Sequence, residues 1–207
     1  MMRLKTVVKF VSAIVLILVL LWGGKYRDIS KYEQVAGVSV DPAGAGKYRF
    51  GLEIAELGKG SDFTVTSKTV SVQARNLSEA LRQAGLQREY PLRIDGAGLI
   101  VVHSALIGGH MSKISEMVLS EWTGDAAAYI AVADGVSALE ILKNGEQTDL
   151  RSGQLSGQIR RAQQQGMRLL NARRSASRYL SGETLILPLV RVGEEDYRIV
   201  GSITVSR

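Results

Sequence analysis

The pattern of hydrophobic positions opens with an uncharged run that follows a short basic segment. Phe10–Gly24 contains no charged residue, and three cations lie within the nine residues before it. Extended back to Val7, the run has 18 residues, which at about 1.5 Å per residue just crosses a hydrocarbon core of about 30 Å. The pattern predicts an uncleaved membrane anchor over residues 1–24, whose anchoring side chains are Phe10, Val11, Ile14, Leu18, Leu21 and Trp22.

A cleaved signal peptide and a buried core helix are the alternatives to this anchor. Signal cleavage requires small residues at two positions just before the cut, but Trp22 or Leu21 would occupy the upstream position for a cut after Gly24 or Gly23. The cations before the run and the mixed charges after it favour a cytoplasmic N-terminus. Residues 25–207 are therefore expected outside the cytoplasm.

Beyond the anchor, the pattern changes to the period of β-strands. Residues 34–41 alternate small and apolar side chains, residues 41–47 are rich in Pro and Gly, and residues 48–54 alternate again. These features predict a β-hairpin, and residues 68–74 predict a third strand. Asn76 with Glu79 three residues later then predicts a helix start, and Gly85 is the expected stop.

The remaining pattern alternates strands and helices. Residues 99–102 are continuously apolar, which is typical of a strand covered on both faces. Apolar residues at helical spacing follow, at Ile107, Met111, Ile114, Met117, Val118 and Trp122. Further elements are expected at 126–133 (strand), 136–143, 155–165 and 172–180 (helices), and 185–192 and 197–205 (strands). The fold class is therefore α/β (α+β): an N-terminal transmembrane helix followed by one domain, residues 25–207, with a mixed β-sheet, packed helices and an undecided strand order.

Charge is unevenly distributed along this domain. The chain has a formal net charge of +6, and residues 151–178 contain seven arginines and no acid. We consider six of them as contacts for a partner or an anionic surface: Arg160, Arg161, Arg168, Arg173, Arg174 and Arg178. The alternative is an ordinary solvated helical face. Nucleic acid is not an expected partner, because the segment has no aromatic residue on which a base could stack.

The search for catalytic chemistry finds little. The chain has no cysteine, which excludes disulfides, cysteine-ligated metals, a cysteine nucleophile and a lipidated cysteine. His103 and His110 are seven apart and lack the spacing of two ligands on one helical face, so structural or surface roles are expected. Residues 95–98 (DGAG) are interpreted as a turn, and Glu194 and Glu195 fall in an expected hairpin turn. No cofactor, metal or enzymatic activity is predicted.

Several segments, taken in order, resemble a known family. Residues 27–29 (RDI) resemble the element that follows the family's lipid-attachment site, and residues 35–41 (VAGVSVD) resemble its first strand, which closes on Asp. Residues 72–82 resemble its next strand and helix, and three later segments match in order: 99–102, 129–135 and 187–188. The family is the Ger(x)C family, the C subunits of bacterial spore germinant receptors, and the resemblance covers its first domain.

The chain departs from the family pattern in three respects. Family members usually carry a lipobox Gly-Cys where this chain has Gly23-Gly24, so the hydrophobic segment itself is expected to hold the protein at the membrane. A common His is Gly96 here, and an Arg-Asp pair has become Ser120-Glu121. Family members typically continue into further domains, whereas this sequence stops at Arg207.

The resemblance implies a non-enzymatic subunit or accessory protein of a germinant receptor at the spore inner membrane. It would assemble with polytopic A and B subunits and support the response to nutrient germinants. The alternative is a sporulation-stage structural or assembly protein that uses the domain for self-association. A third reading, an extracytoplasmic enzyme or solute-binding protein, would need a pocket with convergent polar groups.

Overall fold

The computed structural model describes residues 32–57, 65–123, 127–143, 150–192 and 197–207. The chain divides into two units, Met1–Lys31 and Tyr32–Arg207, and all described residues belong to the second. The expected anchor and its side chains therefore lie outside the described residues. Among the helices that are described, none has the length and apolar character needed to cross a bilayer.

The first three strands form an antiparallel meander. β1 (Glu33–Gly44) and β2 (Lys47–Leu57) are the expected hairpin, and β3 (Val65–Ala74) pairs with β2. The turn is tight because Gly44, Ala45 and Gly46 all have positive φ, a conformation that glycine adopts without strain. The strands are longer than predicted, because they continue as paired β-structure beyond the alternating segments.

The other elements follow the predicted alternation. After the meander come α2 (Leu77–Gly85), the two-residue β4 (Leu92–Arg93), β5 (Leu99–His103), a 3₁₀ turn (Ser104–Leu106), α3 (Met111–Ser120), β6 (Tyr129–Ala133), α4 (Ala138–Leu142), α5 (Arg151–Gln164), α6 (Ala172–Leu180), β7 (Leu185–Val192) and β8 (Tyr197–Val205).

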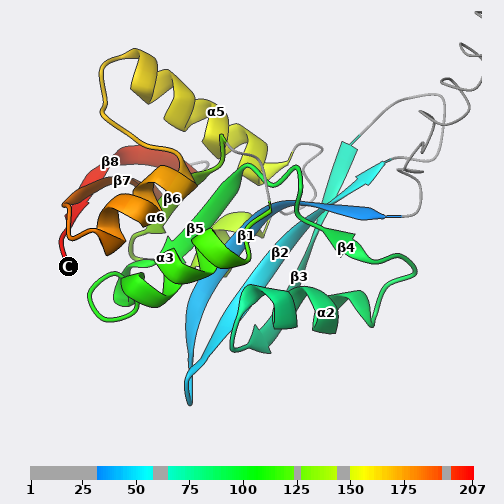
Figure 1. The fold of residues 1–207 in the computed structure, drawn as a ribbon. Helices are drawn as coiled ribbons and strands as arrows, with labels where there is room; N and C mark the ends of the chain where they lie inside the picture. Colours follow the sequence, from blue (N-terminus) through cyan, green and yellow to red (C-terminus); the bar gives the residue numbers. More distant parts are fainter. Residues whose placement is uncertain (1–31, 58–64, 124–126, 144–149, 193–196) are drawn as a thin grey trace, which may run out of the picture. The chain divides into compact units, whose positions relative to one another are not determined.

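These strands form one eight-stranded mixed sheet in the order β3-β2-β1-β5-β6-β7-β8, with β4 also paired to β1 (Figure 1). The pairs β1–β4, β1–β5, β5–β6 and β6–β7 are parallel, and the outer pairs β1–β2, β2–β3 and β7–β8 are antiparallel. The predicted mixed sheet is thus confirmed, and the strand order left open by the sequence is now defined. β5 lies centrally, which explains its continuous apolar run.

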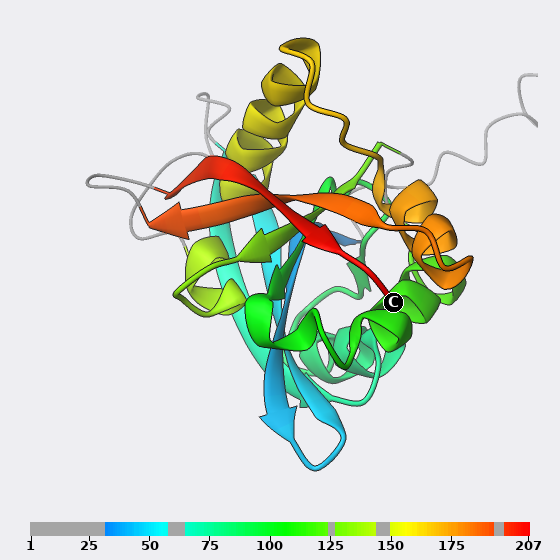
Figure 2. The same cartoon turned by 90° about the vertical axis from the view of Figure 1, so that its left-hand side faces the viewer.

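Helices cover both faces of this sheet and enclose two apolar clusters. The larger cluster joins the sheet to α2, α3 and α6, and includes Phe50, Leu52, Ile100 and Ile130. The smaller cluster joins the other face to α4 and α5, and includes Leu99 and Val101. Figure 2 shows α4 (yellow-green) on one side of the strands and α3 and α6 on the other. For brevity we call these two sides the α2/α3/α6 face and the α4/α5 face.

The largest differences between predicted and observed helix boundaries are at the starts of two helices, α3 and α5. The helix expected from Ile107 begins only at Met111, because Gly108 and Gly109 are unfavourable in a helix interior; Ile107 is nevertheless buried. The α5 helix begins at Arg151, four residues earlier than predicted. Its first turn is stabilised by a carboxylate from β2, a long-range contact that a local pattern does not reveal.

Candidate functional site

The six candidate arginines are exposed but do not share one surface. Arg160 and Arg161 lie on α5, whose buried residues belong to the α4/α5 face, and Arg168 lies in the α5–α6 connection. The remaining three, Arg173, Arg174 and Arg178, lie on α6, which packs on the α2/α3/α6 face.

The arginines that lie together in the sequence therefore form two groups, on opposite faces of the sheet. The connection after Gly166, which has a φ of +100°, carries the chain from one face to the other. Leu169 still belongs to the smaller cluster, whereas Ala172 belongs to the larger one. A cluster of charges in sequence was thus divided by the path of the backbone.

Most of these arginines project without an acidic neighbour. Arg178 lies 3.6 Å from Glu183, and within the described part of the chain none of the other five forms an ion pair. Arg151, the seventh arginine of the segment, is different: it is buried, and its guanidinium lies 5.4 Å from the centre of the Tyr197 ring. The basic groups open to a partner are therefore the Arg160–Arg161 pair, Arg168 and, on α6, Arg173 and Arg174.

Two buried carboxylates hold the helices of the α4/α5 face. The Asp41 carboxylate accepts hydrogen bonds from the backbone N–H groups of Ala138 (2.7 Å) and Leu139 (2.8 Å) at the start of α4. The Glu53 carboxylate accepts from Arg151 (2.6 Å) and Ser152 (2.9 Å) at the start of α5. Each carboxylate thus satisfies N–H groups that a helix leaves without intrahelical partners.

Burial raises the pKa of Glu53, although hydrogen bonds from Ser152 and Arg151 and the charge of Arg151 oppose that shift. Desolvation destabilises the ionised carboxylate more than these contacts favour it. This environment is that of a structural capping group. Within the described residues, no group of three or more His, Asp or Glu side chains is placed to hold a metal.

The sequence analysis did not identify Asp41 and Glu53 as residues that cap helices, although the pattern of side chains on β1 and β2 contains a signal for this role. On β1 and β2, the residues that face α4 and α5 are small or acidic: Gly37, Ser39, Asp41, Gly51 and Glu53. A Cβ on Gly51 would lie 2.5 Å from Leu139 Cδ1, and one on Gly37 would lie 2.6 Å from Ser152 Cβ. The small residues therefore allow the two helices to approach the sheet closely.

Both histidines take part in local contacts. His103 Nδ1 accepts a hydrogen bond from the backbone N–H of Ala105 (3.0 Å) and caps the 3₁₀ turn. His110 Nδ1 lies 3.0 Å from the Tyr48 hydroxyl, with the two rings edge to face. As the sequence suggested, residues 95–98 begin with a turn, in which the Ala97 N–H bonds to the Ile94 carbonyl (2.9 Å).

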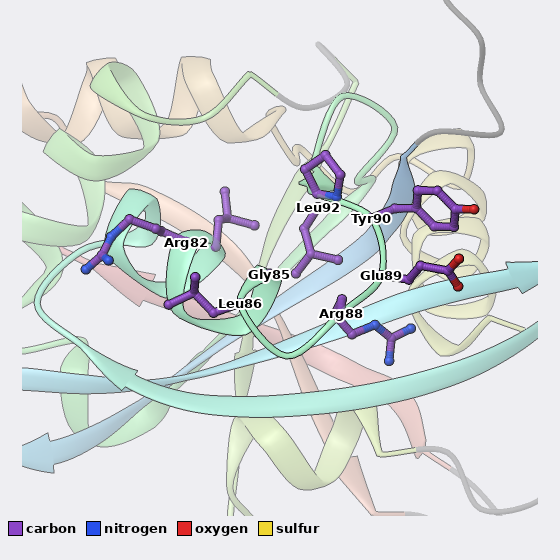
Figure 3. A pocket seen from close by; sticks show the side chains of 9 residues that line it. Arg82, Gly85, Leu86, Arg88, Glu89, Tyr90 and Leu92 are labelled. Atoms are coloured by element: carbon purple, nitrogen blue, oxygen red, sulfur yellow. The ribbon is translucent and has the colours of Figure 1, made fainter.

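A groove of about 420 Å³ opens between the end of α2 and β4 (Figure 3). It is lined by Leu81, Arg82, Gly85, Leu86, Arg88, Glu89, Tyr90, Pro91 and Leu92. One lining residue, Arg88, is held in place by ion pairs with Glu33 at the start of β1 and with Glu56 near the end of β2 (2.9 Å). The groove therefore has a lining held by ion pairs, and it lies at the end of the sheet where β1 begins.

With this geometry in view, comparison with known proteins defines the family. Residues 25–192 match the model of the spore germination protein N-terminal domain. The chain belongs to this family, the N-terminal domain of the Ger(x)C proteins, and the resemblance noted in the sequence is confirmed.

Other comparisons add little to this assignment. No curated protein is significantly similar to the chain. The crystal structure of the GerBC protein is similar with 12% identity and a TM-score of 0.40, over 83% of this chain and 48% of that one. The chain thus spans about half the length of the GerBC chain in that structure.

Proposed function

We propose that the protein is a membrane-anchored, non-enzymatic subunit or accessory protein of a spore germinant receptor. In this role it supports nutrient-triggered germination through protein–protein contacts. The observation that carries the proposal is the family match, which spans residues 25–192 and therefore most of the chain. Polytopic A and B subunits of the receptor are the proposed partners.

The proposed location is the spore inner membrane, with a single pass, a cytoplasmic N-terminus and the domain outside the cytoplasm. The uncharged run and the cations that precede it support this topology. Because the chain has no cysteine, the anchor would be the hydrophobic segment rather than a lipid.

The arginines of α6 are the proposed contact with an acidic partner surface. Arg173 and Arg174 are exposed, adjacent and without an acidic neighbour among the described residues, so their charges are open to a partner. Arg160 and Arg161 on α5 form a second exposed pair on the other face of the sheet and provide a comparison. Desolvated charge pairs at an interface change binding much more than charges at its rim.

A pull-down from detergent-solubilised spore inner membrane tests this proposal. The tagged full-length protein should recover A- and B-type subunits, and the double variant Arg173→Glu/Arg174→Glu should recover several-fold less. Arg160→Glu/Arg161→Glu, which changes the charge by the same amount on the other face of the sheet, locates the contact and is the matched control. Arg198→Glu, an exposed arginine on β8, adds a single charge reversal elsewhere on the surface.

Two outcomes would count against the receptor role. Recovery of the protein itself or of sporulation assembly proteins, without receptor subunits, would favour the self-association alternative. Deletion of the gene with no change in germination by any nutrient would refute the role in germination, whatever the protein binds.

A further inference from the structure

Large apolar side chains are exposed around the α2–β4 groove. Leu86 is 76% exposed, Tyr32 is 40% exposed and Tyr90 is 37% exposed. Leu86 and Tyr90 line the groove, with Pro91 beside them. Figure 3 shows Tyr90 directed outward next to the first residues of β1, and Leu86 at the other side of the groove. Exposed apolar groups gathered in one place, rather than scattered singly, mark an interaction surface.

This surface adjoins the place where the described chain begins. The Glu33 N–H donates to the Pro91 carbonyl (3.2 Å), and Glu33 pairs with Leu92 in the sheet. Tyr32, one residue earlier, lies with its ring 4.9 Å from the Arg93 guanidinium carbon. Tyr32 therefore lies beside the groove. We call the two together the β1-start surface: Tyr32, Leu81, Arg82, Leu86, Tyr90 and Pro91, with the Glu89 carboxylate also in the groove lining.

The length of chain before Tyr32 limits how far this surface can lie from a bilayer. Seven residues, 25–31, separate the proposed anchor from Tyr32. Even fully extended, they span at most about 25 Å. Such a short tether gives nearby groups a high effective concentration at the membrane, so a modest apolar surface is sufficient for contact.

We propose that the β1-start surface rests on the bilayer and contacts its headgroup region. This inference rests on the anchor in the proposed function. Leu86 would enter the acyl boundary, and Tyr32 and Tyr90 would lie at the interface, where an amphipathic ring has both apolar and hydrogen-bonding neighbours. Arg82, exposed at the edge of the groove, is placed to meet lipid phosphate, whereas Arg88 is already paired with Glu33 and Glu56.

Two other exposed apolar residues provide matched controls. Ile186 on β7 is 41% exposed and Val200 on β8 is 42% exposed, close to the values for the two tyrosines. They lie on the two strands farthest from β1 on that side of the sheet order, beyond β5 and β6. A membrane contact at the β1-start surface predicts a difference between Tyr90 and these two positions, although all three have nearly the same exposure.

The absence of cysteine from the chain makes the test direct. Leu86→Cys, Tyr90→Cys, Ile186→Cys and Val200→Cys in the full-length protein would each carry a single nitroxide label in liposomes of phosphatidylglycerol and phosphatidylethanolamine. Labels at 86 and 90 should have an oxygen-to-nickel accessibility ratio several-fold above that of labels at 186 and 200, because oxygen concentrates in lipid and a polar nickel complex does not.

Each other result would overturn the inference in a distinct way. If the protein floats with the liposomes but all four labels have the same ratio, the anchor stands and the surface contact is refuted. If labels at 86 and 90 are shielded from both reagents, a second copy or a partner protein covers the surface instead. If the protein does not float, the proposed anchor fails and this inference fails with it, whereas a germination phenotype would still support the receptor role.

Discussion

The two faces of the central sheet are held by different physical means. On the α2/α3/α6 face, large apolar side chains fill the space between strands and helices, and Phe50, Leu52 and Ile100 are fully buried. On the α4/α5 face, β1 and β2 present glycine and carboxylate instead, and the helices are attached through their N-terminal N–H groups.

This difference shows how one pair of strands can hold helices on its two sides by two kinds of contact. Apolar burial is non-directional and its contribution grows with area, so that face tolerates variation in helix placement. Hydrogen bonds between Asp41 or Glu53 and backbone N–H groups require one position and orientation of each helix. The α4/α5 face is therefore the more precisely specified, although it buries less apolar surface.

The largest expected effect on stability comes from a substitution on the α2/α3/α6 face. Phe50→Ala should lower the free energy of unfolding by about 3–5 kcal/mol, because it leaves a cavity in the larger cluster and removes the edge contact with Tyr48. Denaturant unfolding of the full-length protein in detergent, followed by far-UV circular dichroism, measures the loss. Val200→Ala, at an exposed strand position, should cost less than about 1 kcal/mol, and an equal loss in the two variants would contradict the account.

Removing a carboxylate from the α4/α5 face should lower the free energy of unfolding by less, but its effect should be more local. Asp41→Ala orphans two buried N–H groups and should destabilise the protein by about 2–3 kcal/mol, whereas Asp41→Asn keeps one acceptor and should lose less. Hydrogen exchange should accelerate in α4 before α2 and α3.

Asp134→Ala is the control, because it removes only an exposed pairing with Arg191 and should change the free energy of unfolding by less than about 1 kcal/mol. Uniform acceleration across all helices would show that the two faces are not separate.

The close approach of α4 can be tested at a single glycine. Gly51→Ala places a Cβ 2.3 Å from Ser39 Oγ and 2.5 Å from Leu139 Cδ1, and should cost about 1–3 kcal/mol through overpacking. Gly201→Ala is the matched control, since nothing lies within 4 Å of its Cβ and its strand backbone suits alanine. If both substitutions are neutral in thermal unfolding, the close packing argument is wrong.

The smallest effect concerns pH. Burial raises the pKa of Glu53 above its ordinary value of 4.5. The folded state therefore binds a proton at this carboxyl group more tightly than the unfolded state does. The contribution of Glu53 to stability is therefore most favourable at low pH and falls as pH rises through the window above 4.5. Relative to Glu53→Gln, the wild type should lose unfolding free energy between pH 4 and pH 7. A wild-type advantage over Glu53→Gln that grows with pH would reverse the assigned sign.

Prediction from sequence was most accurate where the determinants are local. The expected ranges of α6, β7 and β8 coincide with the structure, and the Asn76–Glu79 signal is seen as a hydrogen bond from the Glu79 N–H to Asn76 Oδ1 (2.8 Å). β4 was missed because two residues carry no periodic pattern. The role of Glu53 was missed because its partners are 98 and 99 residues away along the chain.

By itself, the sequence determined the succession of strands and helices, the mixed α/β class and the family, because hydrophobic period, turn residues and helix caps act within a few residues. Only the tertiary structure decided the strand order, the division of the arginines between two faces, the use of Asp41 and Glu53 as helix caps, and the gathering of Tyr32, Leu86 and Tyr90 at one edge. Those properties depend on contacts between segments far apart in the chain, and the free energy of such contacts exists only once the backbone has folded.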